Sequence, residues 1–278
     1  MSKIQSAAII MAALLLLILY LFVPTRPKER AQVDKTRVLE AEARSTISVE
    51  QLLLAAKSTL SANQIEPVLD LEKQLDATTD NTEKAKLLKL ISREWNKLNS
   101  FALGGFYAEQ VAGITKTDSA WAIAGSTYYS GFQQARDSLV RDFCLSNAIT
   151  SFENAISVNP ENSSHKVNLG LCFVNGGSNP MKGIMMIREV AEENPEDILA
   201  SMTLGKLSMQ TGQFEKAINR FQNVIQIDGT NVDAHYWVAQ AYRQSNDLSN
   251  AKKHFQKCLE LAKDESLKAK IQEILMDI

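Results

Sequence analysis

The sequence predicts an all-α chain built from stacked helical hairpins, and three observations lead to this fold class. Gly and Pro are few, 12 and 6 in 278 residues, whereas sandwiches and barrels need many turn residues. Apolar residues recur at helical spacing along the chain. In addition, the C-terminal part repeats itself at an interval of 34 residues, and self-similarity at such a period is typical of helical solenoids.

The first element is an uncharged, mainly apolar run at residues 4–23, which predicts a membrane-spanning helix. About 20 apolar residues are needed to cross a bilayer, and this run is longer than the apolar region of a typical cleaved signal peptide. No cleavage site made of small residues follows it, because the chain continues with Pro24 and Arg26. We therefore expect a transmembrane anchor at 1–24 and a charged linker at 25–46.

The side of the membrane that carries the rest of the chain stays open at this stage. The basic residues behind the anchor, beginning with Arg26, favour the cytoplasm by the positive-inside rule. A short N-terminal tail that carries Lys3 favours the opposite orientation. The widely spaced Cys144, Cys172 and Cys258 favour a reducing compartment and predict buried core residues, with no disulfide framework.

Residues 47–117 predict an N-terminal helical cap that includes a degenerate repeat. Ser61 and Gln64 have the spacing of a capping box at the start of a helix. The degenerate repeat at about 83–117 contains the segment Phe101–Ala112, in which Gly104 and Gly105 predict close helix packing. A cap of this kind covers the apolar face that the first full repeat would otherwise expose.

Four repeat units are expected at 118–162, 163–197, 198–231 and 232–265, followed by a capping helix at 266–278. The clearest match is a set of three residues that returns after 34 positions: Ala217, Phe221 and Val224 become Ala251, Phe255 and Cys258. The first unit is longer than the others because of an insertion near 131–145, which either lengthens both of its helices or forms a lid. An insertion of this kind maps to one face of a solenoid.

These units resemble the tetratricopeptide-repeat (TPR) family, in a pattern that starts at Trp121, Gly125 and Tyr128 and continues at Ala148, Phe152, Ala155 and Pro160. The resemblance implies a solenoid that binds a protein or peptide partner in its concave groove. The family's groove positions fall on Ala122, Ser126, Tyr129, Val167, Leu171, Val174, Met202, Lys206, Met209, Tyr236, Gln240 and Arg243. The family's carboxylate-clamp set does not occur at these positions, so the resemblance implies a mainly apolar groove with polar or basic groups at Lys206, Gln240 and Arg243.

The sequence predicts no enzyme. His165, His235 and His254 stand in different units without metal-ligand spacing, and no phosphate-binding loop or nucleophile motif is present. The 30 basic and 32 acidic residues give a net charge of −2, which offers no basis for nucleic-acid binding. We expect no cofactor, no metal and no small-molecule substrate.

The favoured interpretation is a membrane-anchored scaffold or adaptor that holds a protein partner close to the membrane. The layout resembles that of bacterial membrane TPR proteins that assist assembly of membrane or envelope complexes, which implies the bacterial inner membrane. Two alternatives remain open. One is a structural subunit of a stable membrane complex, and the other is an organelle import-type receptor.

Overall fold

The structure is a computed structural model that describes residues 47–177 and 179–278, and every regular element in these residues is a helix. The prediction of an all-helical solenoid is thus confirmed for the described part of the chain. The predicted anchor at 1–24 and linker at 25–46 lie outside it. Among the described residues, no helix combines the length and the apolar character that crossing a bilayer requires.

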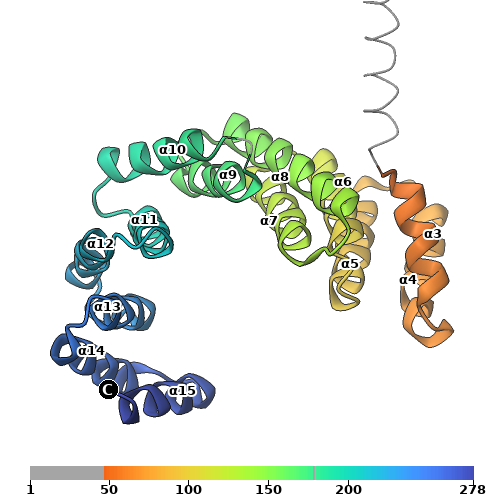
Figure 1. Cartoon of the computed structure of the whole chain (residues 1–278). Helices are drawn as coiled ribbons and strands as arrows, with labels where there is room; N and C mark the ends of the chain where they lie inside the picture. The colour runs from red at the N-terminus through yellow and green to blue at the C-terminus, as the bar shows by residue number, and fades with distance from the viewer. Residues whose placement is uncertain (1–46, 178) are drawn as a thin grey trace, which may run out of the picture. The chain divides into compact units, whose positions relative to one another are not determined.

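The helices follow one another with short connections (Figure 1). In chain order they are α3 (Val49–Thr59), α4 (Ala62–Ala77), α5 (Asn81–Lys97), α6 (Phe101–Thr115), α7 (Asp118–Gln134), α8 (Ser138–Val158), α9 (Ser163–Gly176), α10 (Pro180–Glu193), α11 (Ile198–Gln210), α12 (Phe214–Ile227), α13 (Val232–Gln244), α14 (Leu248–Leu261) and α15 (Glu265–Met276). Residues 49–278 form one compact unit.

From α5 to α14 the helices form five hairpins, α5–α6, α7–α8, α9–α10, α11–α12 and α13–α14. We call the first helix of each hairpin its A helix and the second its B helix. Each hairpin packs against the next, and α15 packs against α14 at the C-terminal end. The apolar stripe of each hairpin is therefore covered by its neighbours, which is the arrangement expected of a repeat protein.

Side-chain caps define where most of the helices begin. The side chain of an Asp, Asn or Thr before the helix accepts a hydrogen bond from a backbone N–H of the first turn. Each such cap stabilises the fold by about 1 kcal/mol. These residues are Asp80, Thr117, Asp137, Asn162, Asn179, Asp197, Asn231, Asp247 and Asp264. At α4 the predicted capping box of Ser61 and Gln64 is present.

The A helices of three hairpins end in the same way. Asn99, Gly212 and Asn246 adopt positive φ angles of 56°, 71° and 65°. After Gly212, the N–H of Gln213 donates to the carbonyl of Ser208, which closes a Schellman motif. Asn and Gly tolerate this left-handed conformation better than other residues, so these residues favour the turn between the two helices of each hairpin.

The core consists of the small and aromatic residues that carry the sequence repeat. Phe221 and Phe255 are fully buried on α12 and α14, and all three cysteines are buried. A Cβ atom at Gly205 would lie 2.4 Å from the Phe221 ring, which explains why the A helix has glycine at this position. The side chain of Phe221 therefore fills the space that the missing side chain of Gly205 leaves.

The insertion near 131–145 lengthens both helices of its hairpin. α7 has 17 residues and α8 has 21, compared with 13 and 14 in α11 and α12. Its apolar side chains pack against neighbouring residues. Phe132 and Cys144 are buried, and Leu145 packs so closely on Gly176 that a Cβ atom there would lie 2.5 Å from it. The structure thus shows longer helices at this position instead of a lid.

Candidate partner-binding surface

The A helices form a continuous surface because α7, α9, α11 and α13 each contact the next one. In Figure 1, α11 and α13 lie on the inner side of the row, with α10 and α12 outside them. We call this surface the A-helix face. Equivalent positions on successive A helices lie side by side on it, so a bound segment contacts several repeats at once.

The predicted groove residues divide into buried and accessible positions. Val167 and Met202 are only 0% and 7% exposed, and Met202 packs in a core cluster with Phe221 and Val238. Met202 therefore stabilises the hairpin stack and is not available to a partner. Partly exposed predicted residues are Ala122, Tyr129, Leu171, Val174, Lys206, Met209, Tyr236, Gln240 and Arg243, and Ser126 is exposed.

At the C-terminal end of the A-helix face, basic and aromatic side chains form a cluster around Trp237. Lys206 Nζ lies 5.3 Å from the centre of the Trp237 ring, and Lys270 Nζ lies 5.3 Å from that of Tyr236. The two rings meet edge to face at 5.7 Å, and Gln240 Nε2 donates to the Tyr236 hydroxyl over 3.1 Å. We call these five residues the Trp237 cluster; it offers cations and aromatic faces that are already oriented.

Two members of the Trp237 cluster were not predicted from the sequence. Trp237 is the sixth residue of α13, between the positions that the family pattern marks as groove-lining. Lys270 belongs to α15, which the pattern does not include. The sequence contained one indication of this cluster. Tyr236 and Gln240 are four residues apart, so they lie on the same face of α13, and Trp237 directly follows Tyr236.

Tyr129 joins α7 to α9 at the N-terminal end of the face. Its hydroxyl accepts a hydrogen bond from the Asn175 side chain, and its ring stacks on Phe132 at 5.9 Å. Burial raises the pKa of Tyr129 above its usual value. The residue therefore acts as a neutral, oriented aromatic group that also fixes the angle between two repeats.

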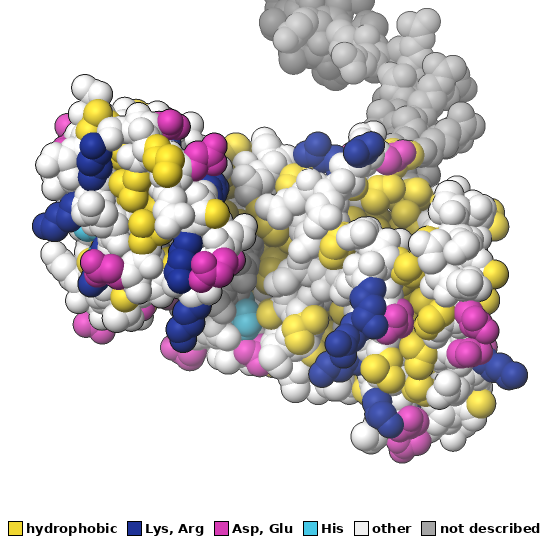
Figure 2. All heavy atoms as spheres, turned by 90° about the horizontal axis from the view of Figure 1, so that it is seen from below, with side chains coloured by type: hydrophobic (Ala, Val, Ile, Leu, Met, Phe, Trp, Pro, Cys, Tyr) yellow, Lys and Arg dark blue, Asp and Glu magenta, His cyan; other side chains and the backbone are white. Residues whose placement is uncertain are grey.

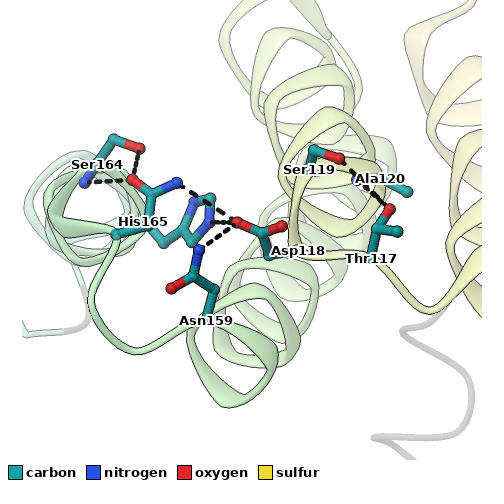
Figure 3. Close-up of polar contacts among 8 residues, drawn as sticks. Thr117, Asp118, Ser119, Ala120, Asn159, Ser164 and His165 are labelled. Carbon is teal, nitrogen blue, oxygen red and sulfur yellow. Dashed lines mark hydrogen bonds and ion pairs between the residues drawn. The ribbon is translucent and has the colours of Figure 1, made fainter.

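Asp118 forms a polar joint between the α7–α8 hairpin and α9 (Figure 3). Its Oδ2 atom accepts hydrogen bonds from His165 Nε2 and Asn159 Nδ2, both at 3.0 Å. The hydrogen bond from His165, followed by that from Asn159, lowers the pKa of Asp118 to about 2. His165 is 3% exposed, so its hydrogen bond to Asp118 holds two repeats together.

A second polar joint lies inside the last hairpin. His235 Nε2 lies 3.2 Å from the Gly229 carbonyl, and the Nδ1 atoms of His235 and His254 are 3.0 Å apart. Because a carbonyl can only accept, the Nε2 atom of His235 is the donor there, and its Nδ1 accepts from His254. Burial is the main cause that lowers the pKa of His254 to about 4, and the nearby basic groups His235 and Lys253 act in the same direction.

Comparison with known proteins identifies the repeats. A family model described as TPR repeat matches residues 205–246, and one described as tetratricopeptide repeat matches residues 232–265. This chain contains tetratricopeptide repeats. A search of the curated proteins found no match to its sequence. TPR repeats are a protein-interaction architecture, and in this chain their A helices form one continuous surface.

Three solved structures are similar to this chain to different degrees. PilW, described as a widely conserved type IV pilus biogenesis factor, is 17% identical; the match covers 69% of this chain and 86% of PilW, with a TM-score of 0.50. YrrB, a TPR protein with an unusual peptide-binding site, is 18% identical over 73% of this chain and 97% of YrrB, with a TM-score of 0.42. MamA from Desulfovibrio magneticus RS-1 is 20% identical over 64% and 94%, with a TM-score of 0.43.

Proposed function

We propose that this protein is a membrane-anchored TPR scaffold that binds a segment of a partner protein on its A-helix face and assists assembly of a membrane or envelope complex. The observation that carries the proposal is the Trp237 cluster, of which all members but Lys270 lie within the matched repeats, and which presents Lys206, Tyr236 and Lys270 on one surface. Trp and Tyr side chains are enriched at the centres of protein interfaces, and the lysines beside them offer charge complementarity to an acidic partner.

The anchor in this proposal is the apolar run at 4–23, which is long enough to cross a bilayer. The bacterial inner membrane is the proposed location, and the basic residues that follow the run favour the cytoplasmic side for the repeats. Holding the repeats at the membrane raises the effective concentration of a partner there. Extraction of membranes at alkaline pH tests this part: the full chain should stay in the membrane fraction, and a chain lacking residues 1–24 should be released.

Crosslinking followed by affinity purification tests the partner-binding surface. The full chain is compared with a Lys206→Glu, Arg243→Glu variant, which changes two partly exposed side chains of the A-helix face. A Lys252→Glu, Lys263→Glu variant is the matched control, since both of those lysines are exposed outside this face. Circular dichroism verifies that all three are folded.

We expect a specific partner to crosslink with the wild type and the control and to be lost from the Lys206→Glu, Arg243→Glu variant. Recovery of the same proteins with all three chains would show that the A-helix face is not the binding site. Recovery of fixed stoichiometric companions that resist dissociation would instead identify a structural subunit of a stable complex.

A further inference from the structure

A second accessible surface lies between α5 and α7, at the other end of the row of A helices. Here the two A helices border a cavity of about 450 Å³ whose floor is α6. A neighbouring cavity of about 370 Å³ continues along α7 toward Asn96 and Ser130. Ile123 lines both cavities and is 57% exposed. We call the two cavities together the α5–α7 groove.

The groove is open because α6 lacks the large side chain that fills the equivalent space in three other B helices, α10, α12 and α14. The eighth residue is Phe221 in α12, Phe255 in α14 and Ile187 in α10, and all three are fully buried. The eighth residue of α6 is Ala108, which lines the groove floor together with Val111. The space between α5 and α7 therefore remains open to solvent.

The α5–α7 groove has an apolar floor, which α6 supplies, and a basic edge, which α5 supplies. Its charged lining residues are Lys86 and Lys89 of α5, and no Asp or Glu of the described chain lines either cavity. Lys86 makes an exposed ion pair with Glu83 at 3.3 Å, and such pairs contribute little to stability. Figure 2 shows basic side chains beside hydrophobic and acidic ones on the right-hand half of the surface, the end of the row that contains α5.

We propose that the α5–α7 groove binds a partner-protein segment in which an apolar side chain is flanked by Asp or Glu. The apolar side chain would cover Ile123, Val111 and Ala108, where it removes exposed apolar surface from water. The carboxylates would face Lys89 and also Lys86, whose exposed ion pair with Glu83 leaves it able to exchange partners. This site is separate from the Trp237 cluster but shares α7 with the A-helix face. The proposal therefore rests on the proposed function and adds to it a second binding position and the class of peptide that binds there.

Peptide selection tests the proposal without a known partner. A display library of short random linear peptides is selected against the purified full chain, and the enriched peptides are then measured by fluorescence anisotropy. We expect enriched sequences in which Asp or Glu flank an apolar residue, and we expect their affinity to fall as the salt concentration rises.

Variants then locate the site. The Lys86→Glu, Lys89→Glu variant should weaken the binding of these peptides at least about tenfold, because each reversed charge repels a carboxylate. Ile123→Ser should also weaken it, and the Lys252→Glu, Lys263→Glu control should not. Circular dichroism verifies the fold of each variant, and Ile123→Ser changes only an exposed position.

Three outcomes would overturn the proposal. One is that no acidic peptide is enriched, and another is that the enriched peptides bind the Lys86→Glu, Lys89→Glu variant as tightly as the wild type. The third is that their binding is lost only in the Lys206→Glu, Arg243→Glu variant. That last result would support the A-helix face around the Trp237 cluster as the binding site and so leave the proposed function intact.

Discussion

The two ends of the row of A helices use the same repeat position in opposite ways. Ile123 and Trp237 are each the sixth residue of their A helix, α7 and α13. Trp237 stacks on Phe221 of the preceding B helix, with ring centres 6.4 Å apart, and lies next to Lys206. Ile123 shares its cavity with Ala108 of the preceding B helix and stays 57% exposed.

At these two positions, the exposure of the A-helix residue follows the size of one side chain of the preceding B helix. Where that side chain is Phe221, the A-helix residue packs on it and contributes to stability. Where it is Ala108, the A-helix residue remains accessible to a partner. Substitutions at equivalent places should therefore affect stability at the C-terminal end and binding at the N-terminal end.

The largest expected contrast is between Met202→Asp and Ile123→Asp. Met202 is 7% exposed in a core cluster, so an aspartate there would bury an unpaired charge and lower the free energy of unfolding by about 3–5 kcal/mol. Ile123→Asp places the same charge in solvent and should cost no more than about 1 kcal/mol. Urea unfolding followed by circular dichroism measures both, and equal losses would contradict the distinction between a buried and an exposed position of the A helices.

A pair of glycine substitutions should show effects of opposite sign. Gly205→Ala places a Cβ atom 2.4 Å from the Phe221 ring, and such overpacking costs about 1–3 kcal/mol. At Gly113 in α6, an added Cβ atom would meet no other atom within 4 Å, so Gly113→Ala should stabilise by about 0.5–1 kcal/mol through helix propensity. Thermal unfolding of both variants decides this, and stabilisation by Gly205→Ala would mean that α11 and α12 are not closely packed.

Mild acid should destabilise the C-terminal hairpin, α13–α14, before the rest of the repeats. The pKa of His254 is lowered from 6.5 to about 4, so the unfolded chain binds a proton that the folded chain does not. The free energy of unfolding therefore carries no penalty from His254 above pH 6.5. It falls by about 1–2 kcal/mol, after allowance for solvent screening, as the pH drops from 6.5 toward 4. The pKa of Asp118 is lowered from 3.8 to about 2, so the joint between α7 and α9 keeps its contribution through this window and loses it only below pH 3.8.

Hydrogen exchange at a series of pH values measures this contrast. Amides of α13 and α14 should lose protection between pH 6.5 and 4, while those at the start of α9, beside His165, keep theirs. His254→Gln removes the titrating group and should flatten the pH dependence of α13 and α14. Unchanged pH dependence in that variant would assign the effect to another group.

Much of the fold could be predicted because the repeat is recorded in residues with a direct steric role. Phe221 and Phe255 return at a spacing of 34 residues and are both fully buried. Asp197 and Asn231, also 34 residues apart, cap α11 and α13. The insertion was located from the sequence, but its structure could not be predicted. Whether it forms longer helices or a lid depends on contacts such as that of Leu145 with Gly176 of α9, which no local pattern reveals.

The candidate sites were harder to predict because they depend on distances between helices of different repeats. Met202 and Lys206 both match groove positions in the family pattern, yet the first is buried and the second lies beside Trp237. The α5–α7 groove results from the size of Ala108, an ordinary residue in a helix. Its significance emerges only when the residue is compared with Phe221 at the equivalent place in α12.

The smallest expected effect comes from the cation–π contact between Lys206 and Trp237 at the C-terminal end. Lys206→Met keeps most of the packed stem and removes the charge above Trp237, so unfolding should become easier by about 0.5–1 kcal/mol. Lys89→Met at the open end should change stability by less than about 0.5 kcal/mol. A double-mutant cycle with Trp237→Leu isolates the contact: if Lys206→Met costs as much in the Trp237→Leu background as in the wild type, the two side chains are not coupled. Loss of that cost in the Trp237→Leu background would show that Lys206 and Trp237 stabilise this end together, a contact that Ile123 and Lys89 cannot form across the α5–α7 groove.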